Sequence, residues 1–195
     1  EQPITFDVNQ QGNIVKINYQ NGLFSLPIEN ADEYPQTQPI SDQANIITIS
    51  SNLLAENNNR TLFATAQDEL RPVMNGIYFD LTPECLAIVA SDGHKLVRNK
   101  IFTVQSEQPA SFILPKKPAT LLKNLLQKDG GDVEIRFDER NAQISFSDGQ
   151  IICRLIEGRY PNYNSVIPQG NPNIVTIDRI GLLSALRRVQ PFAHD

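Results

Sequence analysis

The sequence predicts an α+β fold in which helices pack on a mostly antiparallel sheet. Three observations lead to this prediction. Short β-like runs recur along the chain, polar turn signals separate them, and a few longer segments space their apolar residues as amphipathic helices do. The chain has 195 residues, of which 40% are hydrophobic and 20% charged, a composition typical of a globular protein with an ordinary core.

The predicted strands are rich in β-branched and aromatic residues. Turn sequences such as Ser91-Asp92-Gly93 and Ser147-Asp148-Gly149 lie between some of them and favour antiparallel hairpins. The predicted strands are Ile14–Tyr19, Leu23–Ile28, Ile46–Ile49, Gly76–Leu81, Leu86–Ala90, Phe112–Leu114, Val133–Phe137, Gln143–Phe146 and Ile151–Ile156.

Three helices are predicted from their capping residues. The first begins at Ser50 or Ser51 and runs to about Ala64. The second follows Leu114 and has proline in its first turn, and the third begins after Asp178.

The second helix is predicted to be amphipathic. At about 100° per residue, its apolar residues separate from its lysines, so we expect the apolar side to dock on a sheet and a basic side to face outward. The apolar side holds Ala119, Leu121, Leu122, Leu125 and Leu126. A solvated lysine face with no ligand is the alternative interpretation.

The chain also repeats itself. Tyr34-Pro35 and Tyr160-Pro161 lie 126 positions apart, and the strand-to-helix segments 47–50 and 175–178 lie 128 positions apart. A unit of this size is a domain rather than a solenoid repeat. We therefore expect pseudo-symmetric tandem domains, with the end of one domain in residues 1–40, a complete domain in 41–166, and the start of another in 167–195.

Net charge hides an uneven distribution. The formal net charge is −5, which by itself argues against a nucleic-acid partner. The whole excess lies in residues 1–47, which carry one base and six acids, whereas residues 48–195 carry 16 of each. Bases without acids cluster in residues 115–128 and 179–190.

Composition excludes several classes of protein. No stretch approaches the roughly 18 apolar residues of a membrane helix, and the start does not read as a signal peptide. Cys85 and Cys153 belong to no metal-binding or disulfide pattern, and there are only two histidines, so we predict reduced thiols, a cytoplasmic location, no metal and no cofactor. The only methionine is Met74 and the chain begins at Glu1, which predicts a piece, or a processed form, of a longer protein.

Four motifs resemble one known family, and they occur in its order. They are Arg71–Gly76, Ser91–Leu96, Leu114–Lys117 and Leu155–Tyr163, the last continuing to Val166-Ile167-Pro168. Together they resemble the bacterial DNA polymerase III beta subunits, the sliding clamps. The resemblance covers nearly all of this chain and about half of a full clamp.

The resemblance implies a DNA clamp fold, in which each domain packs two helices on mostly antiparallel sheet. It also implies a homodimeric ring that encircles duplex DNA without reading its sequence and that is not an enzyme. Such a ring tethers the polymerase III alpha subunit for processive synthesis. Other implied partners are the clamp loader and further proteins that carry a clamp-binding motif.

Two sets of site residues follow from the resemblance. A hydrophobic pocket for partner peptides is implied at Met74, Ser91, Gly93, His94, Lys95, Leu96, Pro161, Ser165 and Val166. Ser165 and Lys95 stand where many clamps have arginine, so the polar rim is expected to differ. The DNA-facing helix residues are implied to be Arg60, Lys116, Lys117, Lys123, Arg187 and Arg188.

Other interpretations compete with the clamp. Ser91–Leu96 alone is also an ordinary Asp-Gly hairpin turn. A nucleophilic group of Ser91, Asp92 and His94 is disfavoured, because residues so close in sequence rarely converge as a triad and no nucleophile elbow is present. A β-rich cell-surface or carbohydrate-binding module suits the acidic, strand-rich chain, but tryptophan and calcium-type acidic loops are lacking.

Overall fold

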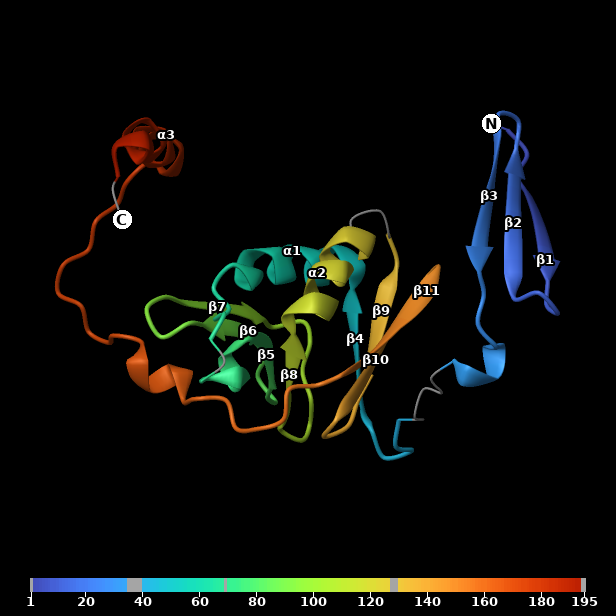
Figure 1. The fold of residues 1–195 in the computed structure, drawn as a ribbon. Coiled ribbons are helices and arrows are strands. Elements are labelled where there is room, and N and C mark those ends of the chain that lie inside the picture. The colour runs from blue at the N-terminus through green and yellow to red at the C-terminus, as the bar shows by residue number, and fades with distance from the viewer. Residues whose placement is uncertain (1, 35–39, 69, 127–129, 194–195) are drawn as a thin grey trace.

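A computed structural model describes residues 2–34, 40–68, 70–126 and 130–193. The described chain contains a central body of two sheets and two helices, with a small sheet before it and a helix after it (Figure 1). None of the helices in these residues is both long enough and apolar enough to cross a membrane.

The central body has two four-stranded sheets. Every strand pair in them is antiparallel, as predicted. One sheet has the order β11-β10-β9-β4 and the other β7-β6-β5-β8. The bounds are β4 (Asn45–Ser50), β5 (Gly76–Leu81), β6 (Leu86–Ser91), β7 (Leu96–Ile101), β8 (Ala110–Pro115), β9 (Asp132–Phe137), β10 (Asn141–Phe146) and β11 (Gly149–Arg154).

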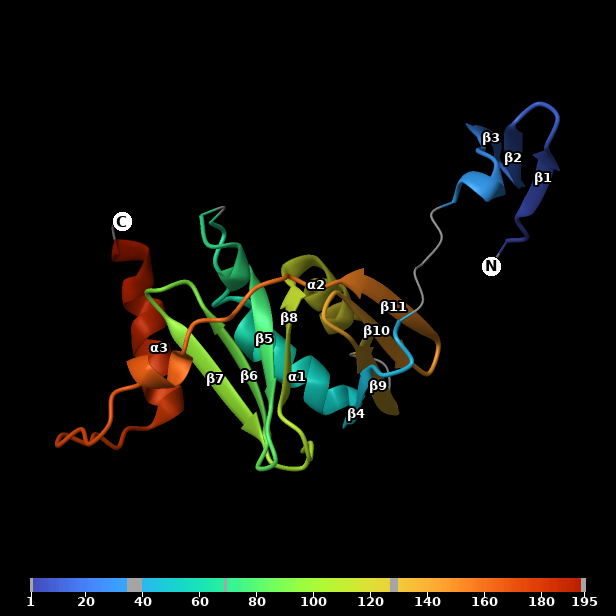
Figure 2. The same cartoon turned by 90° about the horizontal axis from the view of Figure 1, so that it is seen from below.

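The central body consists of two similar halves. In each half a strand leads directly into a helix, and three antiparallel strands follow: β4, α1 (Ser51–Leu62) and β5–β7, then β8, α2 (Lys116–Leu125) and β9–β11. The first strand of each half pairs with the other half, β4 with β9 and β8 with β5. This pairing across the halves joins them into one body. The helices α1 and α2 lie together on one face of it (Figures 1 and 2).

Local sequence explains where the helices begin. Ser50 ends β4, and its Oγ accepts a hydrogen bond from the Leu53 amide at 3.4 Å, which caps α1 as predicted. Asp178 caps α3 (Arg179–Val189) in the same way by accepting from the Gly181 amide. The first helix ends at Leu62, two residues before the predicted end.

The main core lies between the two helices and the two sheets. Phe79 of β5 stacks on Phe112 of β8 with ring centroids 4.6 Å apart, and Leu54 of α1 and Leu122 of α2 cover this layer. A second buried cluster lies on the other face of the β7-β6-β5-β8 sheet, where Val89 and Ile113 meet Tyr160 and Tyr163. This sheet is therefore covered on both faces.

The prediction of a broad apolar side on α2 is wrong in part. Ala119, Leu122 and Leu126 are buried, but Leu121 and Leu125 are 45% and 48% exposed. The three buried residues span only about 60° of the helix, whereas Leu121 lies about 100° from Leu122. The helix docks through a narrow stripe beside α1, so its flanks stay in contact with solvent.

Two strands were not predicted, and one predicted strand does not form. The missed strands are β1 (Thr5–Asn9) and β7, whose Arg98 and Lys100 hide the apolar alternation. Residues 175–177 were expected to form a strand but are not in one, and Val175 and Ile177 are exposed. A strand needs a partner for its backbone groups, and this segment has none among the described residues.

The small sheet extends the internal repeat. Its order is β1-β2-β3, with β2 (Ile14–Tyr19) and β3 (Gly22–Pro27) each beginning 127 positions before β10 and β11. Phe6 and Val8 of β1 are 63% and 55% exposed, whereas Val133 and Ile135 of β9 are buried under the helices. The small sheet thus has the strand order of β9–β11, and in the described residues no helix covers it.

Candidate functional site

A cavity of about 300 Å³ lies on the central body between the β6–β7 turn and residues 160–166. Residues from three separate segments line it, and its lining is mainly apolar. The lining residues are Met74, Ser91, Gly93, His94, Lys95, Leu96, Tyr160, Pro161, Asn162, Tyr163 and Val166.

One wall of the cavity is the tight turn between β6 and β7. Ser91 Oγ donates to the Lys95 carbonyl at 2.9 Å and accepts from the Gly93 amide at 3.1 Å. Asp92 Oδ1 accepts from the His94 and Lys95 amides, both at 2.9 Å, and the second carboxylate oxygen pairs with the Lys95 ammonium. The Lys95 hydrogen bonds and these amides hold the pKa of Asp92 well below its usual range.

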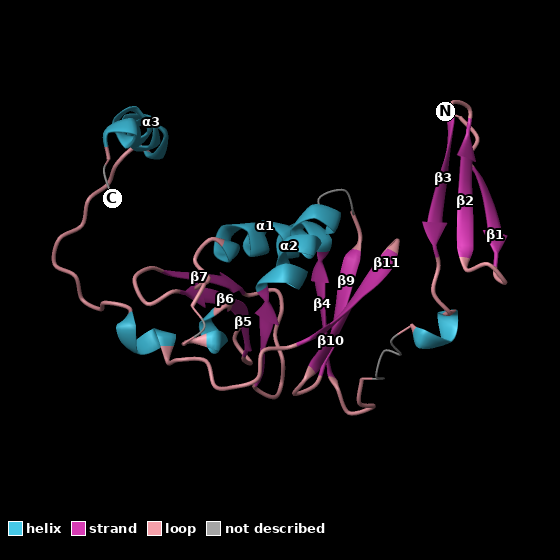
Figure 3. Ribbon diagram, in the orientation of Figure 1, coloured by secondary structure: helices cyan, strands magenta, loops and turns pink. Residues whose placement is uncertain are grey.

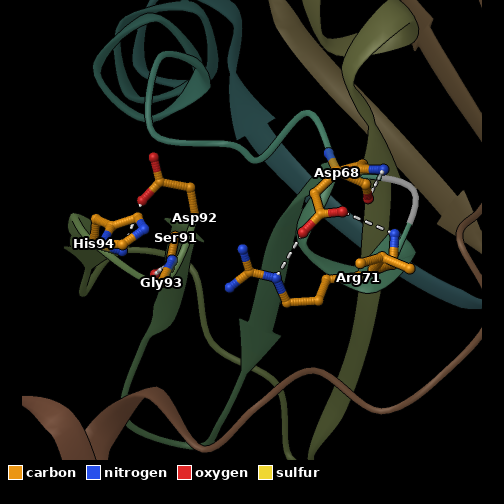
Figure 4. A network of polar contacts seen from close by, with 8 residues as sticks. Asp68, Arg71, Ser91, Asp92, Gly93 and His94 are labelled. Atoms are coloured by element: carbon orange, nitrogen blue, oxygen red, sulfur yellow. Dashed lines mark hydrogen bonds and ion pairs between the residues drawn. The ribbon is translucent and has the colours of Figure 1, made fainter. Parts of the chain in front are cut away.

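The side chain of Arg71 lies beside the turn. Gly93 has φ of +92°, a left-handed conformation that glycine adopts without strain, and a Cβ there would lie 2.5 Å from Arg71 Nη1. Arg71 is held in turn by Asp68, whose Oδ2 accepts from Arg71 Nε at 3.0 Å (Figure 4). Hydrogen bonds from the Leu70 amide and Arg71 lower the pKa of Asp68. The Arg71 guanidinium therefore lies beside Gly93, and Asp68 helps to hold it there.

The opposite wall belongs to the loop that follows β11, which crosses the outer face of the β7-β6-β5-β8 sheet (Figure 3). Tyr160 stacks on Tyr78 of β5 with centroids 4.6 Å apart and an interplanar angle of 2°. Burial raises the pKa of Tyr160 to about 12, so its hydroxyl keeps its proton. Met74 forms a buried floor, and Val166 is exposed at the edge.

The structure brings together eight of the nine residues predicted for a peptide pocket. Ser165 does not line the cavity, because its hydroxyl turns back and donates to the Asn162 carbonyl at 2.7 Å. Tyr160, Asn162 and Tyr163 line the cavity but were not predicted as site residues. All three residues lie close to Pro161 in the motif 155–163, so the sequence pointed to this segment. Only the packed structure shows that these residues line the cavity.

The structure gives no geometry for nucleophilic catalysis at the turn. The Ser91 hydroxyl bonds to its own turn, and Asp92 accepts from backbone amides. These side chains close a hairpin, as expected if Ser91–Leu96 is an ordinary Asp-Gly hairpin turn.

A second feature is the helix face on the other side of the central body. Arg60 of α1 and Lys117 of α2 are exposed there, and Lys116 and Lys123 are half-buried. Arg60 pairs with Glu56 one turn earlier, which partly neutralises it. Arg187 and Arg188 are exposed on α3, outside the central body. The predicted basic residues therefore belong to helices, with four of them on the paired helices α1 and α2.

Comparison with known proteins identifies relatives of one kind. A family model described as the DNA polymerase III beta subunit, central domain, matches residues 48–162. The beta sliding clamp of Synechococcus elongatus is 28% identical over 177 residues, which are 89% of this chain and 47% of that protein. The beta sliding clamp of Pseudomonas aeruginosa is 27% identical over 193 residues, 98% of this chain and 52% of that protein.

Solved structures agree. The DNA polymerase sliding clamp from Bacillus subtilis matches with a TM-score of 0.87 and 25% identity, over 98% of this chain and 50% of its own. A sliding clamp from Bartonella birtlesii, solved bound to griselimycin, matches with a TM-score of 0.85 and 26% identity, over 100% of this chain and 53% of its own. The chain thus spans about half the length of the clamps it matches.

Proposed function

The chain belongs to the DNA polymerase III beta subunit family, and we propose that it is part of a sliding clamp that encircles duplex DNA and tethers the replicative polymerase. The DNA clamp fold expected from the motifs is confirmed by the structural matches. In this proposal the protein is a non-catalytic subunit of the polymerase, located in the bacterial cytoplasm, and it needs no cofactor.

The proposed domain division follows the repeat. Residues 1–40 would be the end of a first clamp domain, 41–166 a complete central domain, and 167–195 the start of a third. The family match at 48–162 falls within the proposed central domain. The small sheet supports the first boundary, since it has the strand order of β9–β11 of the central body.

The observation that carries the function is the cavity. Residues that the family resemblance implies for peptide binding come from segments around 74, 91–96 and 161–166, and all but Ser165 line one hollow of about 300 Å³. Met74 offers an adaptable apolar floor, and Lys95 and His94 offer a polar rim. A short peptide with a leucine or phenylalanine anchor suits this chemistry.

Peptide titration tests this function. A Gln-Leu-x-Leu-Phe-type peptide should bind the full-length protein with a Kd on the order of micromolar, as one small anchored interface gives. It should bind the 195-residue chain more weakly, because the resemblance implies that the third domain completes the pocket. Griselimycin, which is bound to the Bartonella birtlesii clamp, is a second probe. Failure of the full-length protein to bind the peptide would contradict the clamp function.

The DNA partner is proposed from the helix face. Lys116 and Lys117 occupy the first turn of α2, where the positive end of the helix dipole disfavours cations. A local cost of this kind is expected where a residue serves a function. Lysines on helices would contact phosphates without reaching base edges, which gives sequence-independent binding.

Charge reversal on α2 tests the DNA partner. Lys117→Glu with Lys123→Glu should weaken duplex binding by the 195-residue chain and flatten its salt dependence by about 0.9 in log–log slope per lost phosphate contact. Fluorescence anisotropy across a salt series measures both quantities.

Lys100→Glu is the matched control for a single charge reversal. Arg98 contacts Asn164 and Asn99 contacts Thr61 of α1, so alternation places Lys100 with Arg98 on the face opposite the helices. Equal losses from Lys100→Glu and Lys117→Glu alone would show only a net-charge effect and would contradict the proposed DNA face.

The remaining partners belong to the same proposal. The full-length protein is expected to form a ring of two copies and to bind the polymerase III alpha subunit, the clamp loader and other proteins with clamp-binding motifs. The curated relatives are named beta sliding clamps.

A further inference from the structure

One hydrogen bond ties the loop wall of the candidate pocket to the sheet beneath it. Tyr163 Oη donates to Asp80 Oδ2 at 2.7 Å. Tyr163 is only 8% exposed, and it reaches Asp80 of β5 across 83 residues of sequence. Burial, with a further contribution from the Asp80 carboxylate, raises the pKa of Tyr163 well above its usual range, so the hydroxyl stays protonated and donates.

Aromatic packing directs the same contact. Tyr78 and Asp80 are two residues apart on β5, so both side chains point to the outer face of the sheet. Tyr78 stacks flat on Tyr160 and meets Tyr163 edge-on, with centroids 6.2 Å apart and an interplanar angle of 64°. One strand therefore carries the partners of both loop tyrosines.

The anchored tyrosine and the pocket wall belong to one hydrogen-bonded turn. Residues Tyr163–Val166 form a 3-10 turn, capped by Asn162, whose Oδ1 accepts from the Asn164 amide at 3.2 Å. Arg98 Nη1 of β7 donates to Asn164 Oδ1 at 3.0 Å and holds the middle of this turn. A shift at Tyr163 would therefore move Val166 and Pro161, which line the cavity.

We propose that Tyr163 and Asp80 are positioning residues for the candidate peptide pocket: their hydrogen bond fixes the Pro161–Val166 wall in its binding position before a peptide arrives. A wall that is ordered in advance need not be ordered on binding, and this raises affinity without a new contact to the peptide. The inference rests on the proposed function, since it assigns a role within the same site.

Tyr163→Phe is the direct test, because it removes one oxygen and keeps the ring. In the full-length protein, the Kd for the Gln-Leu-x-Leu-Phe-type peptide should rise about fivefold, the effect of losing one hydrogen bond that holds the competent wall. Hydrogen exchange in the peptide-free 195-residue chain should become faster at amides 162–166, while exchange in β5 and β6 stays unchanged.

Asp80 variants separate positioning from simple structural damage. Asp80→Asn keeps an acceptor oxygen and should retain most of the affinity, whereas Asp80→Ala should lose as much as Tyr163→Phe. The double variant Tyr163→Phe with Asp80→Ala should lose no more affinity than either single variant. Tyr34→Phe is the matched control, because Tyr34 is exposed before the central body and should leave binding unchanged.

The outcomes distinguish this inference from the function on which it rests. Unchanged peptide affinity in Tyr163→Phe, or a lower thermal stability with unchanged affinity, would overturn the positioning role. If even the wild-type full-length protein failed to bind the peptide, the proposed function would fail. Hydrogen exchange at 162–166 would then decide by itself whether the tyrosine anchors the wall.

Discussion

Replacing Phe79 by alanine is expected to lower the free energy of unfolding of the central body by about 3–5 kcal/mol. Phe79 is fully buried in the middle of β5, with Phe112 stacked on it. The substitution would remove most of a large side chain from the place where both sheets and both helices meet. It would leave a cavity that the closely packed neighbours cannot fill. Urea unfolding measured by circular dichroism gives the change.

Phe102→Ala is the matched control for this substitution. Phe102 follows β7 and is exposed, so its removal should change the free energy of unfolding by less than about 0.5 kcal/mol. If Phe79→Ala were as harmless as Phe102→Ala, the central position of β5 in the core would be wrong.

Replacing Gly93 by valine is expected to weaken binding of the Gln-Leu-x-Leu-Phe-type peptide to the full-length protein by about tenfold or more. A β-branched residue at φ of +92° is strained by about 1–3 kcal/mol. Its Cβ would also lie 2.5 Å from Arg71 Nη1, the end of a flexible side chain that can shift, so the backbone strain at the turn is the main effect. Strain in the turn displaces the neighbouring His94 and Lys95, which line the cavity, whereas the buried core is not touched.

Isothermal titration calorimetry measures this loss, and thermal unfolding confirms that the variant is folded. Gly149→Ala is the control, because a Cβ there meets only Phe146 at an ordinary 3.7 Å and Gly149 does not line the cavity. Full affinity in Gly93→Val would mean that the β6–β7 turn does not shape the peptide site.

Local sequence was sufficient for the elements whose cause is local. The helix starts at Ser50 and Asp178 follow from capping side chains, and Gly76–Leu81 follows from a run of apolar and aromatic residues. Prediction from the sequence failed where pairing with a neighbouring strand decides whether a strand forms. Val175–Ile177 has strand composition but no partner in the described chain, and β7 forms despite Arg98 and Lys100 because β6 offers it a partner.

The candidate site could be predicted only as a set of residues. The motifs around Met74, Ser91–Leu96 and Pro161 identified its members, but sequence spacing does not show that a loop after β11 crosses the sheet to face the β6–β7 turn. Tyr163 shows the difference most clearly. It was part of a motif, yet its contact with Asp80 depends on how the loop packs.

By itself, the sequence determined the class of fold, the helix starts, the repeat near 127 residues and the family. These depend on short-range chemistry and on motifs that can be read in order along the chain. The tertiary structure alone decided which leucines of α2 are buried, that Ser165 does not line the cavity, and that Arg71 lies beside Gly93. Such contacts join residues through packing and pairing, and those depend on distances in space that residue spacing does not encode.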